Sequence, residues 1–147
     1  MPVGCSFAFR PCCIFLLIVV SCGGSAWATV LTTGDVTPGG GGLQPDPWGI
    51  SGKLKIGEFG SGTLSVQAGG TVLNDDTGTI GHYLGATGVA TVTGTDSIWD
   101  NDQNLIVGLS GSGVLNVTNG GKLLNKSYAS AGYYTCLLYT SPSPRDG

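Results

Sequence analysis

The chain repeats itself about every 25 residues, and this repetition constrains its fold more than any other feature. Residues 60–74 read GSGTLSVQAGGTVLN, and residues 111–125 read GSGVLNVTNGGKLLN. A looser copy, GVATVTGTDSIWD, occupies residues 88–100. Self-similarity at a fixed period of this length is typical of a protein built by stacking one small structural unit upon the next.

Each repeat contains three short apolar stations separated by turn signals. The first station has two apolar residues spaced two apart, which places both side chains on one face of a strand. The second station follows six residues after this pair, and the third directly precedes a glycine. The first stations are Leu64/Val66, Ala90/Val92 and Leu115/Val117; the second are Val72, Ile98 and Leu123; the third are Ile56, Ile80 and Val107.

Three strands and three corners per repeat predict an all-β fold, a β-solenoid of about three coils. Neighbouring strands of successive coils then lie about 4.8 Å apart, and equivalent apolar residues form inward columns. An antiparallel sandwich of hairpins also uses short strands with glycine turns. A hairpin repeat favours two or four strands per unit, however, and this unit has three stations. The predicted inward columns are Leu64, Ala90 and Leu115, and beside them Val66, Val92 and Val117.

Charge and cysteine content exclude several kinds of site. The 147-residue chain has a formal net charge of −3 and no run of Lys or Arg, which argues against nucleic-acid binding. Four of its five cysteines lie in the first 22 residues, the fifth is Cys136, and the repeats contain none. Neither a disulfide framework nor a zinc site is therefore indicated for the repeats.

The N-terminus has the pattern of an export signal. Arg10 supplies the positive charge, residues 14–20 (IFLLIVV) the apolar segment, and residues 26–28 (AWA) the small residues of a cleavage site after Ala28. The alternative is a lipoprotein signal, because residues 19–22 (VVSC) resemble a lipobox. The apolar segment is shorter than the roughly 20 residues of a membrane span. We therefore expect residues 1–28 to form a signal-peptide helix.

Residues 29–52 form a Gly/Pro-rich leader or N-terminal cap before the repeats of residues 53–132. Its glycines and prolines disfavour long regular elements. Trp48 and Ile50 are candidates for covering the open end of the first coil, since terminal repeats need such cover. A loose linker is the alternative.

The ordered motifs of the repeats resemble a known family. GSGxLxVxxGG at residue 60, IG at residue 80, TGxxTVTGxxSxW at residue 87 and LxVG at residue 105 are similar to the passenger-associated repeats of bacterial autotransporter-type surface proteins. The resemblance covers residues 53–125. It implies a right-handed parallel β-helix, display on the cell surface or secretion, and no catalytic residues. Similar repeats occur in exported bacterial proteins that end in a sorting signal and membrane anchor.

The C-terminal residues break the repeat pattern. Residues 136–146 (CLLYTSPSPRD) resemble the conceptual translation of a transposase-type sequencing adapter. We therefore expect residues 133–147 to be a non-native tail and the chain to be a truncated fragment, whose missing part carries a membrane barrel or an anchor. An ordinary Pro-rich disordered tail is the alternative.

The motifs in the repeats that approach a functional site are incomplete. The only histidine, His82, lacks nearby Cys in the sequence, and we expect it at a surface corner. Residues 100–104 (DNDQN) begin like a calcium loop, but Leu105 and Gly111 stand where glycine and glutamate are required. Residues 108–112 (GLSGS) nearly match a nucleophile elbow but end in serine.

Adjacent Asp75 and Asp76 would point to opposite faces of a strand, which does not suit an acid/base pair. Trp99, Tyr83 and Tyr128 are able to stack on sugars, although packing in the core or at corners is the more usual role of such residues. The sequence thus predicts no catalytic residue, no cofactor site and no metal site, and therefore no enzyme.

These observations predict an exported structural or adhesin-like repeat protein, non-catalytic, at the cell surface, in the outer membrane or outside the cell. The expected partner is a surface glycan or protein, with no nucleic acid, and the expected membrane contact is the signal peptide or a missing C-terminal anchor. The alternative is a fragment of a polysaccharide lyase or hydrolase of the β-helix type, because such enzymes share the predicted fold.

Overall fold

The structure, a computed structural model, describes residues 27–132 and the backbone of residues 138–140. The predicted signal-peptide helix and most of the predicted tail lie outside these residues. Every regular element in the described part is a β-strand. No helix in this part is long and apolar enough to cross a membrane.

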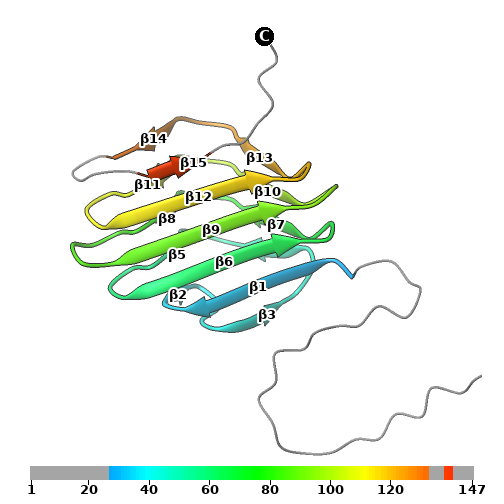
Figure 1. Cartoon of the computed structure of the whole chain (residues 1–147), viewed down its shortest axis with the longest axis horizontal. Coiled ribbons are helices and arrows are strands. Elements are labelled where there is room, and N and C mark those ends of the chain that lie inside the picture. The colour runs from blue at the N-terminus through cyan, green and yellow to red at the C-terminus, as the bar shows by residue number, and fades with distance from the viewer. Residues whose placement is uncertain (1–26, 133–137, 141–147) are drawn as a thin grey trace, which may run out of the picture.

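The repeats wind as a right-handed parallel β-helix with three sheets, which Figure 1 shows from the side of sheet A. Each coil contributes one strand to each sheet, and successive coils pair in parallel. Sheet A contains β6 (Ser61–Gln67), β9 (Thr87–Thr93) and β12 (Ser112–Thr118). Sheet C contains β7 (Thr71–Asn74), β10 (Ile98–Asn101) and β13 (Lys122–Asn125). Sheet B contains β5 (Leu54–Ile56), β8 (Gly78–Ile80), β11 (Leu105–Val107) and β14 (Ala129–Ala131).

The predicted register of the first and third stations is confirmed. Ala90 of β9 pairs with Leu64 below it and Leu115 above it, and Val92 pairs in the same way with Val66 and Val117. Ile80 pairs with Ile56 and Val107 in sheet B. These residues belong to one continuous core, in which Val117 is only partly buried. Each coil therefore buries its apolar face on its neighbours.

The second station was predicted wrongly in the middle coil. Trp99, not Ile98, pairs with Val72 and Leu123 and lies fully buried in the core. The turn before β10 comprises residues 94–97, one more than the turns of residues 68–70 and 119–121. Because side chains alternate along a strand, the extra residue moves Ile98 to the outer face.

Glycines form the corner between sheets B and A. Gly57, Gly81 and Gly108 have φ angles of 69°, 72° and 71°, a region that disfavours other residues. A Cβ added to Gly81 would overlap the backbone carbonyl of Ser112 in the next coil, and one on Gly57 would overlap that of Thr87. The coils therefore approach each other more closely here than a side chain allows.

The leader forms an N-terminal cap with more regular structure than its composition indicates. β1 (Thr29–Gly34) pairs antiparallel with β6, and β2 (Val36–Thr37) pairs antiparallel with β5. β3 (Gly42–Gln44) folds back on β1, whereas β4 (Trp48–Ile50) pairs parallel with β7 and begins sheet C. These strands cover the backbone edges of the first coil.

Trp48 and Ile50, the two candidates for covering the first coil, are buried at this end, with exposed fractions of 6% and 4%. The indole of Trp48 lies against Gly39, where an added Cβ would come within 2.7 Å of its ring. At the other end, the backbone of β15 (Leu138–Thr140) pairs parallel with β12. These three residues extend sheet A by one strand.

Candidate functional site

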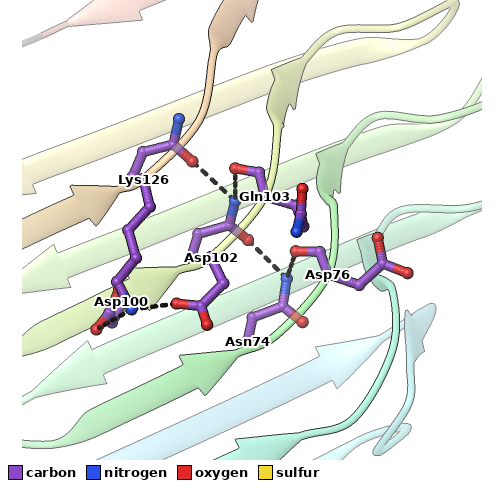
Figure 2. A network of polar contacts seen from close by, with 8 residues as sticks. Asn74, Asp76, Asp100, Asp102, Gln103 and Lys126 are labelled. Atoms are coloured by element: carbon purple, nitrogen blue, oxygen red, sulfur yellow. Dashed lines mark hydrogen bonds and ion pairs between the residues drawn. The ribbon is translucent and has the colours of Figure 1, made fainter.

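A ladder of three asparagines lines the corner between sheets C and B; Figure 2 shows this network and labels its first member, Asn74. Asn74, Asn101 and Asn125 end β7, β10 and β13 and are in register. Nδ2 of Asn74 donates to Oδ1 of Asn101 at 2.6 Å, and Nδ2 of Asn101 donates to Oδ1 of Asn125 at 2.8 Å. Asn74 and Asn101 are buried, so these hydrogen bonds pair amide groups that water does not reach; of the two amides, only Oδ1 of Asn74 has no hydrogen-bond partner among the described residues.

The ladder also fixes the turns that follow it. Nδ2 of Asn74 donates to the carbonyl oxygen of Asp76 at 2.7 Å, and Nδ2 of Asn101 to that of Gln103 at 2.8 Å. Asn125 makes the equivalent bond to Ser127 at 2.9 Å. This ladder was not predicted from the sequence, although asparagine recurs two residues after the inward residue of the second station in every repeat. Its role is structural, since it holds the corner on which the outer side chains stand.

Asn101→Ala is expected to lower the free energy of unfolding by about 1–3 kcal/mol, because it removes the acceptor of the buried Asn74 amide and the donor to the carbonyl oxygen of Gln103. Urea denaturation measures the effect. Asn104→Ala is the matched control: its side chain accepts one exposed hydrogen bond from Ser127, at 2.9 Å, outside the ladder. Equal losses in the two variants would contradict a stabilising ladder.

An open groove of about 260 Å³ lies outside this corner, on sheet C. Lys126 pairs there with Asp102 and, at 3.6 Å, with Asp100. The hydrogen bond that Lys126 donates to Asp102 raises the pKa of Lys126, with a smaller contribution from Asp100. Asp75 accepts a hydrogen bond from the N–H of Gly52 at 2.6 Å. Leu73, Asn74, Asp75, Asp100, Asp102 and Lys126 line the groove.

The structure separates the residues of the calcium-like stretch. Asn101 points into the core, whereas Asp100 and Asp102 lie outside beside Lys126. Within the described residues, no group of three His, Cys, Asp or Glu side chains is arranged to hold a metal ion. Asp76, the neighbour of Asp75 in the sequence, accepts a hydrogen bond from the N–H of Thr77 at 2.6 Å. Each of these acidic side chains thus has a structural partner at one carboxylate oxygen, whereas the buried Oδ1 of Asp100 has no hydrogen-bond partner among the described residues.

Two aromatic rings stack on the corner between sheets B and A. Phe59 and Tyr83 lie one coil apart, with ring centroids 4.7 Å apart and an interplanar angle of 20°. They remain 70% and 44% exposed, and neighbouring Leu84 is 84% exposed. Asp35 anchors this corner, because its Oδ2 accepts hydrogen bonds from the N–H groups of Phe59 at 2.6 Å and Gly60 at 2.7 Å. These two hydrogen bonds lower the pKa of Asp35, and the bond from Gly60 has the larger effect.

His82 lies at this corner, as expected from the sequence. Its ring packs edge-on against Tyr83 at 4.3 Å, and burial lowers its pKa. Its buried Nδ1 has no hydrogen-bond partner among the described residues. In the elbow-like stretch, Gly108 is a corner glycine and the N–H of Ser110 donates to the carbonyl oxygen of His82 at 3.0 Å.

In the part of sheet A whose side chains the structure describes, the outer face has no charged side chain. Its strands β1, β3, β6, β9 and β12 contain none. The charged residues of the described chain lie instead in sheets B and C and in the connecting segments. The outward positions are Leu43 of β3; Thr29, Leu31 and Thr33; Ser61, Thr63, Ser65 and Gln67; Thr87, Val89, Thr91 and Thr93; and Ser112, Val114, Asn116 and Thr118.

Comparisons of the chain with family models, with curated proteins and with solved structures give no match.

The other two aromatic candidates for stacking on sugars, Trp99 and Tyr128, lie in different environments. Trp99 is fully buried in the core, whereas Tyr128 is half-exposed.

Proposed function

We propose that this chain is a non-catalytic segment of an exported bacterial surface or secreted protein, and that it acts as a structural or adhesive rod. The observation that carries this proposal is the stack of in-register coils, in which the same columns recur from one coil to the next. The length of such a stack grows with the number of repeats, while its outer faces stay continuous. The export-signal pattern of residues 1–28 supports placement outside the cytoplasm.

The alternative, a polysaccharide-active enzyme, would use the carboxylates of the groove on sheet C. A glycosidase needs one carboxyl as acid and a second as base or nucleophile. Here Lys126 engages Asp100 and Asp102, and the N–H of Gly52 engages Asp75. These pairings favour the structural role over the enzymatic one.

Export is tested by expressing the full chain with a C-terminal tag in a Gram-negative host. We expect the protein outside the cytoplasm, with a mature N-terminus at Thr29, or at an acylated Cys22 if the lipoprotein signal is used. Mass spectrometry of the purified protein identifies the N-terminus. Leu17→Arg interrupts the apolar segment and should retain the uncleaved chain in the cytoplasm. Finding the unaltered chain uncleaved in the cytoplasm would overturn the proposal.

A further inference from the structure

We propose that the outer face of sheet A, together with the Phe59–Tyr83 corner, binds a neutral polysaccharide chain. This inference rests on the proposed function, since it names the class of partner that the exported rod would hold. It concerns the broad face of β1, β6, β9 and β12 that faces the viewer in Figure 1.

The lack of charge on this face identifies the partner as uncharged. Nucleic acids and anionic polymers are bound chiefly through Lys and Arg, and none stands at an outward position of these strands. A cationic partner would need carboxylates, which are also absent from them. Charged residues are abundant on sheet C and its corner, so this pattern distinguishes sheet A from the other faces of the described solenoid.

The polar groups of this face suit a partner rich in hydroxyls. Hydroxyl and amide side chains stand in register along the coils, such as Ser65, Thr91 and Asn116. They form hydrogen bonds between coils: Thr33 pairs with Thr63, and Oγ1 of Thr118 donates to Oγ1 of Thr93 at 2.9 Å. A hydroxyl offers one donor and two acceptor positions, so such pairs keep capacity for a ligand.

The aromatic corner supplies the apolar part of the site. Phe59 precedes β6 and Tyr83 precedes β9, so the two rings stand where these strands of sheet A begin. Sugar rings combine an apolar C–H face with hydroxyl edges. The former packs on an aromatic surface, and the latter hydrogen-bond to polar side chains.

The regular spacing of the face favours a polymer over a small molecule. Outward residues recur about every 6.6–6.8 Å along a strand and about 4.8 Å between coils, a grid that offers the same groups repeatedly. A small ligand needs a concave site that surrounds it. A long chain of identical sugars instead gains affinity from many weak, equivalent contacts across an open face.

The test uses the purified full chain and measures its depletion from solution by insoluble cellulose, chitin and cross-linked dextran, with cross-linked polygalacturonate as the anionic probe. We expect depletion by at least one neutral polymer, unchanged between 0.15 and 1 M NaCl. Thr91→Lys at the centre of the face should weaken this binding at least tenfold, and Tyr83→Ala several-fold. Circular dichroism melting curves verify that each variant is folded.

Thr71→Lys is the matched control, because Thr71 stands on the outer face of sheet C in the same row as Lys122. It should bind like the unaltered chain. No depletion by any of the neutral polymers, binding lost at 1 M NaCl, or equal weakening by Thr71→Lys would overturn the inference. So would a dimer, detected by light scattering, that Thr91→Lys dissociates, because a second copy would then occupy the face. Successful export with failed glycan binding would leave the proposed function standing.

Discussion

Gly81→Ala is expected to lower the free energy of unfolding by about 2–5 kcal/mol, through left-handed backbone strain and overpacking together. Gly81 has a φ of 72°, and its N–H donates to the carbonyl oxygen of Ile56 in the coil below at 2.8 Å. An added Cβ would overlap the backbone of Ser112 and lie 3.0 Å from the nitrogen of Gly113 in the coil above. Backbone atoms fixed in a sheet are unable to move aside without breaking the stack.

Two other glycines separate the two causes. Gly85 also has a positive φ, 84°, but has open space around its Cβ position, so Gly85→Ala should cost only the strain, about 1–2 kcal/mol. Gly49 has open space too and does not have a positive φ, so Gly49→Ala should change stability by less than about 0.5 kcal/mol. Urea denaturation ranks the three variants. A Gly81→Ala variant no less stable than Gly85→Ala would show that the coils are not in such close contact.

Trp99→Ala is expected to lower the free energy of unfolding by about 3–5 kcal/mol, because it empties the largest fully buried side-chain volume of the core. Trp99 lies between Val72 and Leu123 of the neighbouring coils, so the cavity would open where three coils meet. Ile98→Ala, one residue earlier on the outer face, should cost less than about 1 kcal/mol. Thermal or urea unfolding of the pair compares them. A larger loss of unfolding free energy for Ile98→Ala than for Trp99→Ala would show that Ile98 faces the core, as the spacing along the sequence predicted.

The fold was predictable because its apolar residues recur at fixed places in each repeat. Two of the three stations and the solenoid itself follow from that recurrence. The second station failed at Ile98 because counting assumed turns of equal length, and the turn of residues 94–97 is one residue longer. The hydrophobic pattern does not show which of the two residues faces the core, since Ile98 and Trp99 are both hydrophobic. A turn length is set by backbone conformation, here by the positive φ of Asp96 and Gly94.

The surfaces were harder to predict than the core. Asn74, Asn101 and Asn125 recur in the sequence, but polar residues near turns are usually solvated, so their burial is visible only in the structure. A cap was one of the two alternatives for residues 29–52, but its strands were not predicted: β1 runs antiparallel to the first coil, and no repeat predicts its place. The uncharged face of sheet A emerges only when the outward positions of all the coils are placed side by side.

The central claim is that the coils stack in parallel with a fixed register, and methyl–methyl nuclear Overhauser effects test it most directly. The parallel register places Leu64 beside Ala90 and Val66 beside Val92. The account therefore predicts strong cross-peaks between the methyl groups of these two pairs, and between Val92 and Val117. An antiparallel arrangement of the same two strands would instead bring Leu64 beside Val92 and Val66 beside Ala90. Stronger cross-peaks for that second set would contradict the solenoid.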